Sequence, residues 1–94
     1  MTNNMWAIEN IKSEIDILQH KISDLVESNF YIIEDYLEKD QLENMKEVQH
    51  FGMAYREIRI KFTQSQELLL LYKNEMAKLV AELDSEIKKL KEVE

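Results

Sequence analysis

The feature that most limits the fold is a row of apolar residues, spaced alternately by three and four, in the first part of the chain. Eight of its nine positions are apolar, and the row consists of Ile8, Ile11, Ile15, Leu18, Ile22, Leu25, Asn29, Ile32 and Tyr36. A row with this period lies on one face of an α-helix that packs against another helix along its length. The sequence therefore predicts a helix over about residues 4–38.

A second row of the same kind occupies the C-terminal half. Ten of its twelve positions are apolar: Tyr55, Ile58, Phe62, Ser65, Leu69, Tyr72, Met76, Leu79, Leu83, Glu86, Leu90 and Val93. This row predicts a helix over about residues 54–93. The chain has no proline and one glycine, Gly52, whereas a sheet protein needs such residues at its hairpins. We therefore expect an all-α fold and a single domain, residues 1–94.

The region between the two rows leaves two layouts open. The first row would continue at Lys39 and Glu43, both charged, so the apolar pattern stops there. Either the first helix runs on to Gly52 and folds back as a long antiparallel helical hairpin, or a short helix over about 41–51 makes a long-short-long three-helix coiled-coil bundle. We favour three helices, with Asp40 and Glu43 as a capping box and Gly52 as a C-terminal cap.

A homodimer is expected, because a thin helical chain of this length buries little surface alone. The apolar row widens near the end of the first helix through Val26, Phe30, Ile33 and Leu37. Four consecutive leucines, residues 68–71, cover most of the circumference of the last helix and predict a turn buried from several sides. The residues predicted to mediate self-association are Ile32, Ile33, Leu37, Leu68, Leu70, Leu71 and Tyr72.

Charge and composition point toward protein binding. The formal net charge is −7, and the first 47 residues hold eleven acids against four lysines. This balance argues against direct binding of nucleic acid, and no apolar run has the length of a membrane span. We expect a cytoplasmic, non-catalytic interaction or regulatory protein without a cofactor, which binds itself and another protein. The acidic face predicted for a basic partner consists of Glu34, Asp35, Glu38, Asp40, Glu43 and Glu47.

Two side-chain sets are candidates for metal binding. Glu47 and His50 have the Glu-x-x-His spacing of di-iron helical bundles, although two exposed residues beside a turn would have the same spacing. Asp16, His20 and Asp24 share one helix face, which is expected to be a solvated polar surface. The sequence contains no cysteine and no glycine-rich phosphate loop, so we expect no thiolate chemistry and no catalytic site.

Three partial resemblances supply the alternatives. Residues 11–26 resemble the first helix of the all-helical chorismate mutases, which implies a small enzyme, but Lys12, Asn29 and Asp40 stand where that family has two arginines and a lysine. Residues 65–68 are similar to the Ser-Gln-Glu-Leu-Asp motif of small aspartyl-phosphate phosphatases, whose aspartate is replaced here by Leu69. The Phe51-Gly52 pair is similar to the turn of small exported helical hairpins, which implies a secreted protein.

Overall fold

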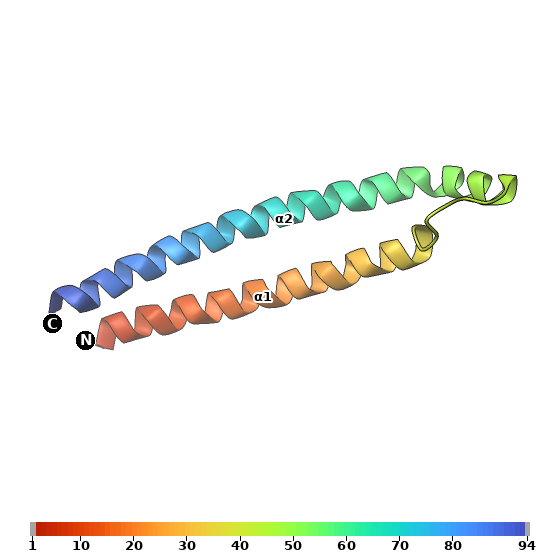
Figure 1. The fold of residues 1–94 in the computed structure, drawn as a ribbon. Helices are drawn as coiled ribbons and strands as arrows, with labels where there is room; N and C mark the ends of the chain where they lie inside the picture. Colours follow the sequence, from red (N-terminus) through yellow and green to blue (C-terminus); the bar gives the residue numbers. More distant parts are fainter. Residues whose placement is uncertain (1, 94) are drawn as a thin grey trace. The chain divides into compact units, whose positions relative to one another are not determined.

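The computed structural model describes residues 2–93, which form two helices and no strand within that range. Helix α1 spans Thr2–Tyr36 and helix α2 spans Met45–Val93, and a loop over residues 37–44 joins them (Figure 1). The predicted all-α fold is confirmed. No helix in the described residues is long and apolar enough to cross a membrane.

The chain divides into two compact units, each made of part of α1 and part of α2. Unit 1 consists of Met1–Ile22 and Leu70–Glu94, and unit 2 is the continuous segment Ser23–Leu69. Within each unit the two helical segments lie side by side and run in opposite directions (Figure 1). Each unit is therefore an antiparallel helix pair.

The core of unit 1 comes from the two predicted rows. Ile11, Leu18 and Leu79 are buried, and the side chains packed around them are Ile15, Ile22, Tyr72, Met76 and Leu83. Apolar side chains of this size contribute about 1.5–3 kcal/mol each when they leave water, which stabilises the pair. The heptad spacing in the sequence therefore identified this core.

Unit 2 has a more polar interior. Leu25, Ile32 and Ile58 are buried there, together with the polar residue Ser65. Asn29 is half-buried and occupies a place in the apolar row that the other positions give to isoleucine, leucine or tyrosine. Unit 2 therefore has less apolar burial along its own seam than the sequence pattern predicts.

The favoured three-helix layout is wrong, because α2 begins at Met45 and continues without a break past residues 52–54. Gly52 is helical, has no positive φ angle and is neither a turn nor a cap. A glycine inside a helix costs about 1 kcal/mol relative to alanine, and so long a helix tolerates it. The chain reverses instead at residues 37–44, where the apolar row ends.

The four-leucine turn is open to solvent in the single chain, whereas the burial predicted for it includes a second chain. Leu68, Leu69, Leu70 and Leu71 are between 38% and 55% exposed, although a turn buried from several sides was expected. The reason is geometric: one neighbouring helix covers only one side of α2, so a turn that is apolar all round keeps most of its surface open.

Candidate functional site

A cavity of about 510 Å³ lies at the loop end of unit 2. Its lining comes from the end of α1, the loop and the start of α2: Asp35, Tyr36, Glu38, Lys39, Leu42, Asn44, Lys46, Glu47, His50 and Phe51. Cavities of this size accept a small ligand or the side chains of a bound peptide. Three of the lining residues, Tyr36, Leu42 and Phe51, are aromatic or aliphatic, and we call these three the apolar floor.

Asn44 fixes where α2 starts. Its Oδ1 atom accepts a hydrogen bond of 2.8 Å from the backbone N–H of Glu47, three residues later. This bond satisfies one of the N–H groups that have no partner in the first turn of a helix. The capping residue is therefore Asn44, and the capping box predicted at Asp40 and Glu43 is wrong by four residues.

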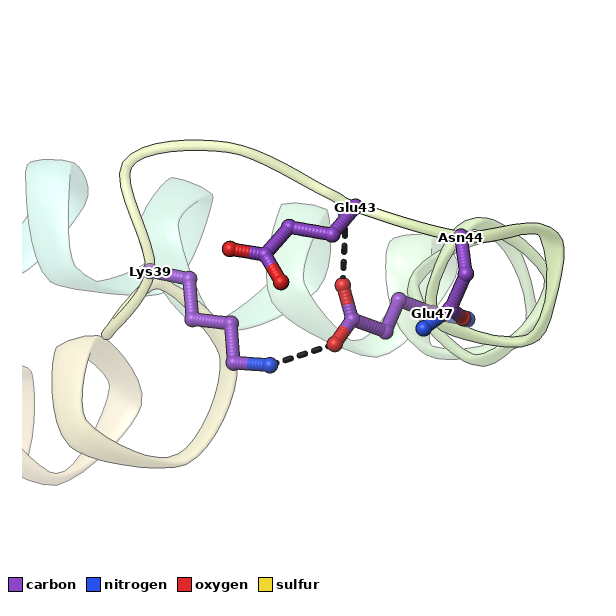
Figure 2. A network of polar contacts seen from close by, with 4 residues as sticks. All are labelled: Lys39, Glu43, Asn44 and Glu47. Carbon is purple, nitrogen blue, oxygen red and sulfur yellow. Dashed lines mark hydrogen bonds and ion pairs between the residues drawn. The ribbon is translucent and has the colours of Figure 1, made fainter.

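Glu47 ties the loop to the helix that follows it (Figure 2). Its Oε2 atom accepts a hydrogen bond of 2.7 Å from the backbone N–H of Glu43, and its Oε1 atom pairs with the ammonium group of Lys39. Lys39 and then the Glu43 N–H hold the pKa of Glu47 below its usual value. The same contact raises the pKa of Lys39. These two contacts therefore fix the loop against the first turn of α2, and we call them the loop clamp.

Tyr36 forms a second polar contact at this end of unit 2. Its hydroxyl donates a hydrogen bond of 3.2 Å to Glu57 on α2. The Lys61 ammonium lies 5.8 Å from the centre of the Tyr36 ring and 3.1 Å from the Glu57 carboxylate. Partial removal from water, followed by the bond to Glu57, raises the pKa of Tyr36. These contacts hold the Tyr36 ring where it lines the cavity.

The predicted acidic face lies at the same end of the unit. Asp35, Glu38 and Glu47 line the cavity, and the other members, Glu34, Asp40 and Glu43, are exposed nearby in the same segment. Residues 34–47 hold six acids and two lysines, so the segment carries a net charge of −4. Of the six acids, Glu47 is the one that forms an ion pair within residues 2–93. The segment around the cavity is therefore net negative, although Lys46 lines the cavity too and forms no ion pair within residues 2–93.

The metal candidates are arranged as follows. Glu47 and His50 line the same cavity, but both carboxylate oxygens of Glu47 are engaged by Lys39 and by the Glu43 N–H. His20 Nδ1 lies 2.7 Å from the carbonyl oxygen of Asp16. Among the described residues, no group of three or more His, Asp or Glu side chains could hold a metal ion.

The predicted self-association residues fall into different environments. Ile33 and Leu37 are exposed in unit 2. Ile32 is buried inside unit 2, and Tyr72 packs against the core of unit 1, so their own chain covers both side chains. Leu68, Leu70 and Leu71 are exposed.

Sequence reasoning missed that three of its predicted core residues are on the surface. Tyr55, Phe62 and Leu69 are 56%, 37% and 43% exposed. They recur every seven residues beside the buried pair Ile58 and Ser65, so they form a separate apolar column on α2. A separate count of the residues that recur every seven positions would have distinguished these three exposed residues from the buried ones.

Comparison with curated proteins and with solved structures gave no match. The family described as TscT toxin protein matches residues 4–94, which is nearly the whole chain and includes all but the first two residues of α1, the loop, α2 and the cavity. This protein therefore belongs to the TscT toxin protein family.

Proposed function

We propose that this protein is a toxin that arrests the growth of cells in which it is produced, and that it acts by binding a target protein instead of by catalysis. The family supports the first half of this proposal. The loop-end cavity supports action by binding, because apolar lining residues lie there beside the acidic segment 34–47, as on a peptide-binding surface.

The chemistry of the cavity defines the class of target. Tyr36, Leu42 and Phe51 offer an apolar surface to one or two large side chains. Asp35, Glu38 and Lys46 line the same cavity without an ion-pair partner among residues 2–93, so the acids outnumber the free cation there by one. A protein segment that presents lysine or arginine beside an aromatic or aliphatic residue complements both features. The target is thus a basic, partly apolar segment of another protein.

Two exposed acids allow a direct test. The Asp35→Lys/Glu38→Lys variant changes the charge of the cavity surround by +4 and introduces bulk beside the floor. Asp35 lies in the last turn of α1, where a cation interacts better with the helix dipole than an anion does, so the fold should persist. The control Glu9→Lys/Asp84→Lys makes the same charge change at exposed acids of unit 1.

Growth after induced expression in a bacterial culture is the readout. Wild type and the Glu9/Asp84 control should stop growth, and the Asp35/Glu38 variant should allow it at equal protein level and equal helicity. Unimpaired growth with the wild type contradicts the toxin assignment, and arrest by all three proteins contradicts the binding surface. Arrest by purified protein added outside the cells, with none on internal expression, contradicts a cytoplasmic site of action.

A further inference from the structure

The two open sides of unit 2 differ in the charged and polar residues that they carry. One side carries a cavity of about 300 Å³, and Ser28, Asp35, Lys61 and Gln64 are among the residues that line it. Ser28 and Asp35 each follow a buried residue of α1, Leu25 or Ile32, by three positions. At about 100° per residue, three positions place a side chain on one flank of the buried column, and one position places it on the other flank. The side away from the cavity is therefore formed by different residues.

That opposite side is mainly apolar, although Arg59 and Gln66 follow the buried column of α2 by one residue and lie on it as well. We call it the apolar side. Val26 and Ile33 follow the buried column of α1 by one residue, and Phe62 and Leu69 lie on the matching flank of α2. The complete set is Val26, Phe30, Ile33, Leu37, Tyr55, Phe62 and Leu69, each between 37% and 62% exposed. Seven large apolar side chains in one band are typical of a surface that another molecule covers.

The interior of unit 2 is consistent with this division. Asn29 and Ser65 occupy central places in its seam, and the Oδ1 atom of Asn29 is buried without a hydrogen-bond partner among the described residues. Polar groups thus replace apolar ones where the two helices meet, while apolar groups accumulate beside them. A second layer of helices on the apolar side would turn the pair into a four-helix arrangement with an apolar centre.

The charges that flank the apolar side indicate which molecule covers it. Glu27 and Glu34 follow the buried column of α1 by two residues and lie on its outer flank. Of the two arginines of the chain, Arg56 lies on the outer flank of α2, and Arg59, one residue after Ile58, extends from the apolar side itself. No ion pair within residues 2–93 involves any of these four residues. Glu27 accepts a hydrogen bond of 3.3 Å from the Tyr31 hydroxyl, and among the described residues the side chains of Glu34, Arg56 and Arg59 remain available to a surface of opposite charge.

The register within unit 2 sets Glu34 and Arg59 at the same height along the helix pair. Tyr36 bonds to Glu57, and Asn29 lines one cavity with Ser65, so residue numbers at one height add up to about 93. Glu34 and Arg59 satisfy this relation. They lie on different helices of one chain, with the seam between them.

We infer that a second copy of this chain covers the apolar side, with the two copies parallel so that α1 of each packs on α2 of the other. A two-fold axis along the helices then brings Glu34 of each copy opposite Arg59 of its partner. The antiparallel alternative packs α1 on α1 and α2 on α2, which sets acids against acids and arginines against arginines. Charge complementarity therefore selects the parallel dimer.

The first test uses one apolar residue on each unit. Ile33 lies on the apolar side and is 49% exposed, whereas Ile17 lies in unit 1 and is 57% exposed. Sedimentation equilibrium should show a dimer for wild type and for Ile17→Glu, and a helical monomer for Ile33→Glu. A wild-type monomer at micromolar concentration, or an Ile33→Glu dimer as tight as wild type, overturns the inference.

The second test separates the two dimer geometries by charge reversal. Glu34→Arg alone and Arg59→Glu alone should each raise the dimer dissociation constant by about tenfold, because each places like charges opposite one another. The double variant Glu34→Arg/Arg59→Glu restores opposite charges and should recover wild-type affinity. Single variants that dimerise as well as wild type overturn the parallel arrangement. Neither test depends on toxicity, so its failure leaves the proposed function standing.

Discussion

Asn29 and Ser65 line one cavity in the middle of unit 2, and the Oδ1 atom of Asn29 is buried there without a hydrogen-bond partner among residues 2–93. A buried acceptor in this state costs about 1–3 kcal/mol of stability. Asn29 thus lowers the stability of unit 2 at its centre.

Replacing Asn29 by leucine should therefore stabilise the protein, by about 1–2 kcal/mol, because it removes the unpaired acceptor and adds apolar burial. Urea unfolding followed by circular dichroism at fixed protein concentration measures this. Asn74→Leu, at an exposed position of α2, is the control and should change the free energy of unfolding by less than about 0.5 kcal/mol. Equal effects at the two sites would mean that the Asn29 amide is not an unsatisfied group.

The cap at the start of α2 gives a second prediction. Asn44→Ala removes the acceptor for the Glu47 N–H and should lower stability by about 1 kcal/mol. Amide hydrogen exchange should quicken in the first turn of α2 and stay unchanged in the middle of α1. Asn44→Asp keeps an acceptor at that place and should retain protection; loss of protection with aspartate would argue against the cap.

Gly52 provides a direct check of the continuous α2 helix. A Cβ atom added at Gly52 would meet nothing within 4 Å, and the residue has no positive φ angle. Gly52→Ala should consequently raise stability by about 0.5–1 kcal/mol in thermal unfolding. If residue 52 were a left-handed helix cap, the same change would destabilise the protein.

The loop clamp should respond to pH in a defined direction. Lys39 and the Glu43 N–H lower the pKa of Glu47 from 4.5, so its contribution to stability is present above about pH 4.5 and is lost as the pH falls through the lowered value. The pKa of Lys39 is raised from 10.5, so its contribution to stability is present below about pH 10.5 and is lost as the pH rises through the raised value. The protection of the Glu43 amide, which is its exchange rate relative to that of an unstructured peptide at the same pH, should therefore be greatest between these limits.

Glu47→Gln is the matched variant for this prediction. Glutamine keeps an oxygen acceptor for the Glu43 N–H but has no charge to lose in acid, so the acid limb of the exchange profile should disappear. A profile for the variant that still follows the wild type below about pH 4.5 would assign the acid transition to other carboxylates.

The helices were predictable because the apolar spacing extends over many turns, and Leu18, Ile11 and Leu79 are buried where that spacing places them. The position of the turn was not predictable from the same rule. Charged residues are equally suited to a loop and to an exposed helix face, and Gly52 is the strongest turn residue in the chain. The pattern Asn44-x-x-Glu47 is also a helix-start signal, and the structure has Asn44 as the cap of α2.

The acidic members of the loop-end site were predicted, since a run of acids is visible in the sequence. The apolar floor was not, because Tyr36, Leu42 and Phe51 meet only through the path of the loop. The apolar side of unit 2 escaped for a different reason. Phe62 and Leu69 fit a core row equally well, and only the packing angle of the two helices decides which flank of Ile58 and Ser65 stays open.

Growth of a bacterial culture after induction of the wild type, beside the Asp35→Lys/Glu38→Lys variant at equal protein level, tests the central claim most directly. We expect the wild type to arrest growth and the variant, folded and equally helical, to allow it, because the acids around the cavity are needed to bind the target. Growth arrest by both proteins would contradict the proposed binding surface, and arrest by neither would contradict the toxin assignment itself.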